Sequence, residues 1–369
     1  MPSDSSTKKL FIGLGIAALY FIITALPAPD GLTPVGKKAI AMMLAAVLVW
    51  VFEVIPIAVS SILFTLLPVV AGIIPLPKVM AHFATPTVFF VFAMFCISIA
   101  FQNSGLNRRV VLWTSLRSRG NPSRLLFFLM MVSALLSTFL ADIPVVAMML
   151  PVAVLLLEKN RCEPGASPFG KAVMLGLPIA CLIGGVGTPA GSAMNMLTIG
   201  LLQDTAKVHI SFFEWMAIGM PMVLILTPVA WWAVIKVFPP EMDRLAGMEL
   251  VEREYAELGP VTGREKLFFV ILLINFILWC TDKIHGLPLP VVAVIGGSLF
   301  VLPRIQLIDW ERDKCRIGWD ILMLIGASNA LGMIIWEQGG ASWIANACLG
   351  DISDLPLAGV IAAISIFTI

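Results

Sequence analysis

Long apolar runs recur along the whole chain and constrain its fold more than any other feature. Most extend over about 16 to 25 residues, enough for a helix to cross a hydrocarbon core of roughly 30 Å. Hydrophobic residues make up 59% of the sequence and charged residues only 13%, whereas a soluble domain carries about 25% charged residues. We therefore predict an all-α, polytopic membrane protein.

The predicted membrane segments are separated by polar loops. They are 10–26, 37–53, 55–71, 86–102, 123–140 with 142–157, 170–203, 212–238, 266–281, 288–303, 317–338 and a last run from 355. The net charge of +1 and the absence of a Lys/Arg tract give no indication of nucleic-acid binding. The six cysteines are scattered singly, without the CxxC spacing of a metal or redox site.

Lysine and arginine residues predict the orientation, because cytoplasmic loops are enriched in them. With Lys8 and Lys9 inside, alternating crossings place four basic loops on the inner side: 103–124, 158–171, 239–266 and 303–316. We thus expect a cytoplasmic N-terminus, in the inner membrane of a bacterium. Lys37 and Lys38 are exceptions, since they fall at an outer boundary where long side chains can snorkel.

An internal repeat links two distant segments. Residues 85–111 resemble residues 318–345, because both are long apolar runs that end in a polar pair and a glycine; Gly105 matches Gly340 at an offset of 340 − 105 = 235. In the expected orientation the copies cross the membrane in opposite directions. Inverted repeats are typical of secondary transporters, whose binding sites lie between the copies. The alternative is that apolar helices simply resemble one another.

The repeat predicts a division into domains. We expect an N-terminal helix in 1–36, a first repeat in 37–238, a cytoplasmic linker in 239–265 and a second repeat in 266–369. The same offset added to Asp142 gives a position beyond Ile369. The second copy of the segment around Asp142 is therefore expected to be missing from this sequence.

Asp142 is a carboxylate within an otherwise apolar stretch, "LADIPVVAMMLPV". By the loop charges, 123–157 begins and ends on the same side, which fits two full crossings or one re-entrant hairpin with its tip near Asp142. The tip has no length for an extramembrane loop. A helix ending near Leu140 and another beginning near Ile143 would leave free carbonyls facing free amides, which attract cations and anions respectively.

A second break is predicted inside 170–203, in the glycine-rich run "CLIGGVGTPAGSAMN". Glycine and proline interrupt a membrane helix there, and Thr188, Ser192 and Asn195 place small oxygen ligands beside the interruption. The alternative is a surface of small residues for close helix packing. We favour a broken helix that lines a site.

These motifs resemble the divalent anion/sodium symporter family, the INDY-type dicarboxylate carriers. The resemblance runs from about Trp50 to the end and is carried by "WVFEVIPIAVSSILFTLLPVVAGIIP", "GLNRRVV", "VAMMLPVA", "IGGVGTPAGSAMN" and "GWDILMLIG". It implies an inverted-repeat homodimer of the elevator type. It also implies transport of a small dicarboxylate, tricarboxylate or sulfate-class anion, with Na+ as the coupling ion and no other cofactor.

In that family two hairpin tips each carry a Ser-Asn-Thr motif. The first falls here on Ala141, Asp142 and Ile143, so that two side-chain oxygens are lost and the amide becomes an acid; the second would lie beyond Ile369. The resemblance implies an ion site at Ser137, Ala141, Asp142 and Gly187. It implies a substrate site at Asp142, Ile143, Thr188, Ser192 and Asn195.

The acid at the tip leaves several hypotheses open. An ionised Asp142 repels a dianion at close range, yet it binds a cation more tightly than an amide does, or carries a proton; it could also only cap the second half-helix. Proton-coupled transport, exchange of a different substrate and a sensing role on the same scaffold remain alternatives. An intramembrane aspartyl enzyme needs a second acid at membrane depth, and Asp320, the only candidate, lies too near the boundary. We expect a transporter, not an enzyme.

Overall fold

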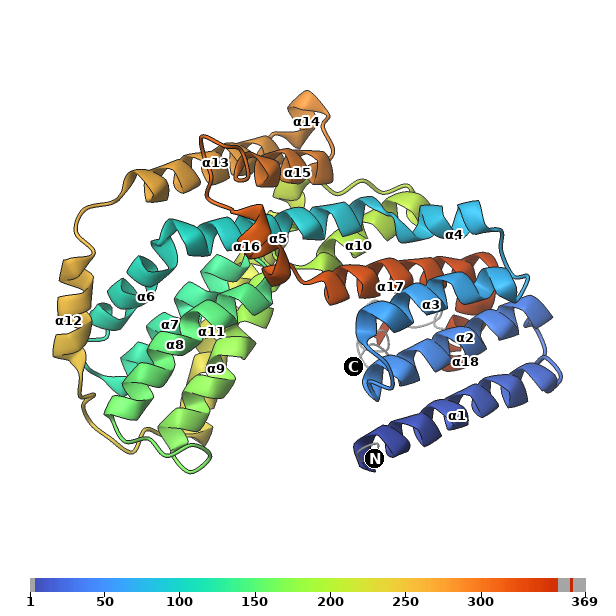
Figure 1. Cartoon of the computed structure of the whole chain (residues 1–369), viewed down its shortest axis with the longest axis horizontal. Helices are drawn as coiled ribbons and strands as arrows, with labels where there is room; N and C mark the ends of the chain where they lie inside the picture. Colours follow the sequence, from blue (N-terminus) through green and yellow to red (C-terminus); the bar gives the residue numbers. More distant parts are fainter. Residues whose placement is uncertain (1–3, 351–358, 361–369) are drawn as a thin grey trace. The chain divides into compact units, whose positions relative to one another are not determined.

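The computed structural model describes the backbone of residues 4–350 and 359–360, and all regular elements among them are helical (Figure 1). It divides into two compact units, Met1–Val88 with Gly318–Ile369, and Phe89–Ile317. Six helical stretches of the described residues are long and apolar enough to cross a membrane: Thr7–Ala25, Pro34–Val51, Leu76–Ser104, Pro168–Gly185, Phe212–Val237 and Trp319–Glu337. The chain is thus all-α and multi-pass, as predicted.

The first unit gathers helices from both ends of the described chain. They are α1 (Asp4–Ala25), α2 (Pro34–Val51), α3 (Ile57–Val70), α4 (Leu76–Phe83), α17 (Trp319–Glu337) and α18 (Gly340–Leu349). α17 packs against α2, α3 and α4, around a core that includes Met42, Ala46, Phe64 and Leu331. Asp320 does not cap its own helix, because its Oδ1 accepts the Ala58 amide at the start of α3 at 3.2 Å.

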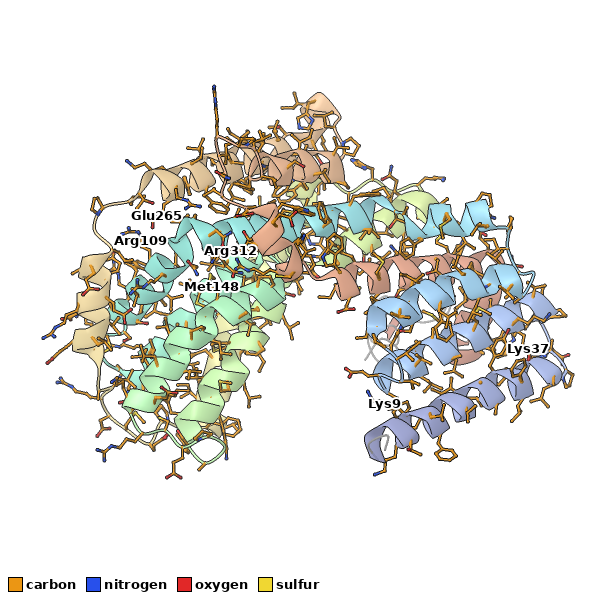
Figure 2. All side chains as sticks on the ribbon, in the orientation of Figure 1. Lys9, Lys37, Arg109, Met148, Glu265 and Arg312 are labelled. Atoms are coloured by element: carbon orange, nitrogen blue, oxygen red, sulfur yellow. The ribbon has the colours of Figure 1, made fainter. Side chains whose placement is uncertain are left out.

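Lys37, predicted to fall at a membrane boundary, binds the end of a neighbouring helix. It is 8% exposed, and its ammonium donates to the carbonyls of Thr24, at 3.0 Å, and of Leu26. These carbonyls lie at the C-terminus of α1, where a cation satisfies orphan acceptors and interacts favourably with the helix dipole. Lys37, labelled in Figure 2, therefore fixes α1 to α2.

The second unit contains the predicted hairpin and the glycine-rich run. Its helices are α5 (Pro86–Ser104, all but the first turn), α6 (Leu106–Arg117), α7 (Pro122–Ser137), α8 (Asp142–Lys159), α9 (Pro168–Gly185), α10 (Ala193–Leu201) with a π-helical end (Leu202–Ala206), α11 (Phe212–Val237), α12 (Met248–Glu257), α13 (Gly263–Cys280), α14 (Asp282–His285), α15 (Leu289–Leu299), α16 (Trp310–Asp313) and a 3₁₀ turn (Lys314–Arg316). α9 packs against α7, α8 and α11. Buried Leu126 and Met130 of α7 pack against Gly176 of α9, where a Cβ would lie 3.0 Å from each side chain.

Two of the segments predicted as loops contain helices of ten residues or more. The 103–124 loop contains α6, and the 239–265 linker contains α12; the two helices pack against each other. Their charged residues concealed the helical pattern in the sequence. Val111 and Leu112 of α6 and Val251 of α12 are nevertheless buried, so each helix has a small apolar face that is covered in the folded unit.

The two segments of the predicted repeat share a local geometry. α5 and α17 are each 19 residues long, and each is followed by a glycine in the left-handed region, Gly105 at φ 91° and Gly339 at φ 75°. A short helix, α6 or α18, then begins at once. The left-handed glycine of the second copy lies one residue before Gly340, the match made from the sequence.

The linker joins the ends of several helices. Asn160, after α8, exchanges hydrogen bonds with the Ala246 backbone at 2.7 and 3.2 Å, and Glu241 accepts the Phe169 amide at the start of α9 at 2.9 Å. Arg109 of α6 forms a bidentate pair with Glu265, at 2.8 and 3.2 Å (Figure 2). Glu265 is only 3% exposed, so this pair is a largely enclosed link between α6 and α13.

The Arg109–Glu265 pair predicts a pH-dependent stability. Hydrogen bonds from Arg109 lower the pKa of Glu265 below its ordinary value of 4.5. A carboxyl group whose pKa is lower in the folded than in the unfolded state stabilises the fold at pH values above its unfolded-state pKa. This stabilisation is lost as the pH falls through the folded-state pKa. We expect E265Q to reduce the free energy of unfolding at pH 7 by about 2 kcal/mol, and the difference from wild type to shrink as the solution is acidified. Chemical unfolding in non-ionic detergent, followed by circular dichroism, measures it.

The matched control is E254Q, which removes the Arg108–Glu254 pair between α6 and α12. Both of its side chains are more exposed, at 52% and 27%, so solvent screening should limit its loss to about 0.5 kcal/mol. Equal losses for the two variants, or a pH-independent loss for E265Q, would contradict the assignment.

Candidate functional site

The hairpin is interrupted between Ser137, the last residue of α7, and Asp142, the first of α8. The break begins three residues earlier than the sequence suggested and α8 one residue earlier. Leu140 still donates to Leu136 O at 2.9 Å, and the Ala141 amide donates to the Ser98 hydroxyl of α5 at 3.3 Å. The tip is therefore a tight, hydrogen-bonded turn.

The glycine-rich run forms the second break, between Gly185 of α9 and Ala193 of α10. α11 supports it from one side. The indole of Trp215 donates to Val186 O at 2.9 Å. Gly219 of α11 comes so close that a Cβ there would lie 2.6 Å from Val186 O. Only a glycine permits this approach of α11 to the unwound segment.

The two breaks lie against each other. The buried hydroxyl of Thr188 donates to Thr138 O at the hairpin tip, at 2.5 Å, and accepts the Ala190 amide at 3.1 Å. A Cβ on Gly191 would lie 2.6 Å from Gly185 O and 2.8 Å from Ser137 O. Backbone carbonyls from both breaks thus crowd around one glycine.

Asp142 lies at this junction. Its Oδ1 accepts the hydroxyl of buried Ser137. A Cβ on Gly185 would lie 3.0 and 3.2 Å from the two carboxylate oxygens of Asp142. The carboxylate therefore lies against the backbone of a residue that has no side chain. Asp142 is the first residue of α8 and not its N-cap, since Ala141 holds that position without a side-chain hydrogen bond. A carboxylate in the first turn is still favoured by the helix dipole.

Asn195 and Ser192 hold the second break in shape. The Asn195 amide donates to Gly185 O at 2.7 Å and to Thr188 O at 2.8 Å, which bridges the unwound segment. The Ser192 hydroxyl accepts the Met194 amide at 3.3 Å and forms the N-cap of α10. These residues satisfy backbone groups that the break would otherwise leave unpaired.

The structure brings most of the predicted residues into one neighbourhood. The contacts described above link four of them: Ser137, Asp142, Thr188 and Asn195. Gly187 joins the same group, because a Cβ on it would lie 2.7 Å from Thr138 Cγ2. The side chain of Ile143 lies outside the described residues. Ser192 is half-buried at the far end of the break.

Three participants were missed by the sequence prediction. Thr138 supplies the carbonyl that Thr188 binds, Gly185 supplies the surface under Asp142, and Ser98 binds the tip from α5. Gly185 belongs to the glycine-rich run that predicts the second break, but its contact with Asp142 was not evident from the sequence. Ser98 is a single hydroxyl in an apolar helix, a pattern that is also typical of side chains bonded to their own helix. Thr138 takes part through its backbone carbonyl, which its residue type does not reveal.

The arrangement suits a hard monovalent cation. It combines a carboxylate, a hydroxyl and backbone carbonyls of unwound helix, the oxygen donors that transporters offer to sodium. Among the described residues no group of three or more His, Cys, Asp and Glu side chains could hold a metal ion.

Comparison with known proteins identifies the family. The sequence model of the sodium:sulfate symporter transmembrane region matches residues 7–369. The chain belongs to the sodium:sulfate symporter family. It is therefore a membrane transporter and not an enzyme, and the resemblance drawn from the hairpin and glycine-rich motifs is confirmed.

Relatives support the same assignment. The chain is 29% identical to the sodium-dependent dicarboxylate transporter SdcS of Staphylococcus saprophyticus, over 90% of this chain and 69% of that protein. It is 27% identical to SdcS of Staphylococcus aureus strain USA300, over 93% and 71%. A protein of Cupriavidus necator named only as a membrane protein is 26% identical, over 93% and 70%.

Gly184, beside the site, allows α9 of this symporter-family chain to approach α7. A Cβ at Gly184 would lie 2.1 Å from Ala134 O, and backbone cannot move aside cheaply. We expect G184A to lower the free energy of unfolding by about 1 to 3 kcal/mol, as measured by chemical unfolding in detergent. The control is G200A in α10, where a Cβ meets nothing within 4 Å and stability should be kept or slightly raised. Wild-type stability in G184A would contradict the close α7–α9 packing.

Proposed function

We propose that this chain is a sodium-coupled carrier of small anions of the dicarboxylate, tricarboxylate or sulfate class, with its ion site where the two helix breaks meet. One observation carries the proposal: the Asp142 carboxylate lies over Gly185 with the Ser137 hydroxyl bound to it. The family description and the sodium-dependent dicarboxylate transporters among the relatives support the ion and the class of substrate.

Electrostatics explains why such a site needs a cation. Two like unit charges 4 Å apart repel by about 4 kcal/mol at an effective dielectric constant of 20, so a dianion beside a bare Asp142 is disfavoured. A sodium ion bound by Asp142 removes that repulsion. Binding of the ion then favours binding of the anion and the reverse, because a coupling free energy acts equally on both ligands.

The donors divide into two groups in this proposal. Sodium is held by the Ser137 hydroxyl and the Asp142 carboxylate, with backbone oxygens near Ala141, Gly185 and Gly187. Thr188, Ser192 and Asn195 line the anion side, and the Ile143 position contributes through the backbone. Because Thr188 and Asn195 already donate to carbonyls, they shape this side more than they donate to the anion.

The arrangement in the cell is part of the same proposal. The chain lies in a bacterial inner membrane with its N-terminus in the cytoplasm, because this places the loops rich in arginine and lysine inside. It works as a homodimer by an elevator movement that carries the bound ion and anion across together. The four expected regions, 1–36, 37–238, 239–265 and 266–369, remain a proposal.

Transport measurements test the function. The purified protein is reconstituted in liposomes, and counterflow of labelled succinate, citrate and sulfate is measured in sodium and in choline buffers across a range of pH. We expect uptake of at least one anion that requires sodium. No uptake of any of the three in either buffer would contradict an anion carrier, and uptake that needs a proton gradient but not sodium would contradict sodium coupling.

Two variants test the ion site within that assay. D142N removes the charge but keeps the shape, and should weaken apparent sodium affinity about tenfold or more. G185A places a methyl group against the carboxylate and should weaken it less, while G200A should match wild type. Unchanged sodium dependence in D142N would show that Asp142 is not an ion ligand.

A further inference from the structure

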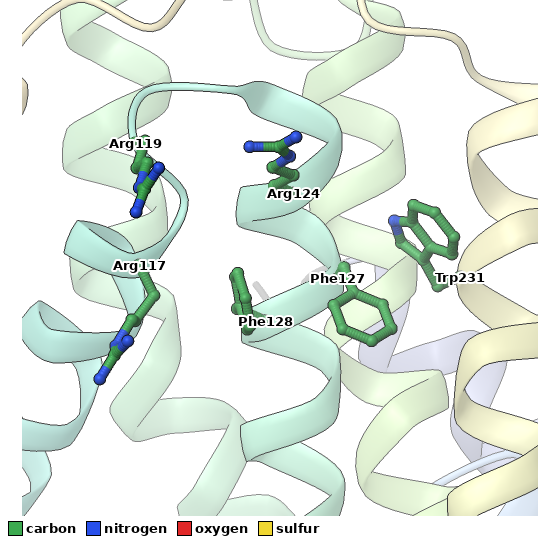
Figure 3. A pocket seen from close by; sticks show the side chains of 6 residues that line it. All are labelled: Arg117, Arg119, Arg124, Phe127, Phe128 and Trp231. Atoms are coloured by element: carbon green, nitrogen blue, oxygen red, sulfur yellow. The ribbon is translucent and has the colours of Figure 1, made fainter.

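A cavity of about 480 Å³ opens beside the turn between α6 and α7, away from the ion site. Arg117, Arg119 and Arg124 line one part of it, and Phe127, Phe128 and Trp231 line the other. Figure 3 shows Arg119 and Arg124 at the turn and the three rings further along α7 and on α11. Arg124 and Ser137 are 13 residues apart on the same helix, which separates the two places by about 20 Å.

Three arginines make up the cationic part of the cavity. None of its three arginines makes an ion pair within the described part of the chain, and Arg119 and Arg124 are exposed. Arg119 is in the left-handed region at φ 52°, which is uncommon for a residue with a Cβ. The turn is fixed because Leu245 donates to Gly120 O at 2.8 Å. The Arg117 guanidinium lies over the Trp113 ring, with its central carbon 5.0 Å from the ring centroid. The cavity therefore presents positive charge that no carboxylate of the described residues neutralises in an ion pair.

The apolar part is built from aromatic rings in edge-to-face contact. Phe127 meets Trp231 edge-to-face, with ring centroids 5.2 Å apart, and Phe128 at 5.5 Å. The Trp231 indole N–H already donates to Ser123 O at 2.9 Å, so the ring offers an apolar surface. Phe127 and Phe128 follow Arg124 by three and four residues, which places them one helical turn further along α7.

Arginines at the turn, followed by aromatic rings one helical turn along α7, fit one kind of ligand. Arginine forks bind phosphate oxygens bidentately, and aromatic rings one turn deeper along an apolar helix contact acyl chains at the membrane interface. Basic pockets between membrane helices are suited to anionic headgroups. We propose that the cavity, which nothing above assigns to transport, binds the headgroup of an anionic phospholipid and the first carbons of its acyl chains.

A fluorescence assay tests this on the whole protein in detergent. Phosphatidylglycerol with a fluorophore at the acyl end is titrated with protein, and its anisotropy is recorded. Unlabelled phosphatidylglycerol, phosphatidylcholine and sodium phosphate serve as competitors. We expect phosphatidylglycerol to compete at least tenfold better than phosphatidylcholine, and millimolar phosphate at matched ionic strength not to compete.

Variants locate the site. R119Q and R124Q should each weaken phosphatidylglycerol binding about fivefold, and F128A should weaken it while leaving its preference over phosphatidylcholine. The control is R161Q, because Arg161 is an exposed arginine that also has a left-handed backbone, at φ 54°, and does not line the cavity. It should bind like wild type, and size-exclusion profiles confirm that each variant is folded.

Three results would overturn the proposal. They are equal competition by the two lipids, full competition by phosphate alone, which would mean a free-anion site, and an equal loss in R161Q, which would mean a diffuse effect of surface charge.

Discussion

Two interrupted helices lie against each other in the second unit, and a hydrogen bond joins the two breaks. A break in a membrane helix frees carbonyls and amides that lipid cannot satisfy. Here Thr188, in one break, donates to Thr138 O in the other, and Asn195 bridges Gly185 and Thr188. The bond between the breaks and the bonds within the second break let the chain keep unwound backbone beside a carboxylate, which is the condition for an ion site there.

Glycine determines how close the two breaks can come. A Cβ on Gly184 would clash with Ala134 O, one on Gly191 with Ser137 O, and one on Gly219 with Val186 O. These contacts are made by backbone on both sides and leave little freedom to adjust. The carbonyls around Gly191 therefore do not depend on a ligand for their position, and a cation at the proposed site would not bear the entropic cost of ordering them.

Most of this architecture could be predicted from the sequence, because its signals are local. Apolar length predicted the helices, and the interruptions at Asp142 and in "IGGVGTPAGSAMN" predicted both breaks. The helices α6 and α12 were missed because buried residues such as Val111 and Val251 are few among charged neighbours. The pairings of Thr188 with Thr138 and of Asp142 with Gly185 join residues 50 and 43 positions apart (188 − 138 and 185 − 142), and no local pattern encodes such contacts.

The central claim is that the two breaks form one sodium site, and hydrogen exchange tests it most directly. Amide exchange is compared in sodium and potassium buffers of equal ionic strength, on peptides that cover 137–145 and 183–195. Both peptides should gain protection in sodium together, and both gains should disappear in D142N. Exchange that is identical in the two buffers, or protection of only one peptide, would contradict a shared site.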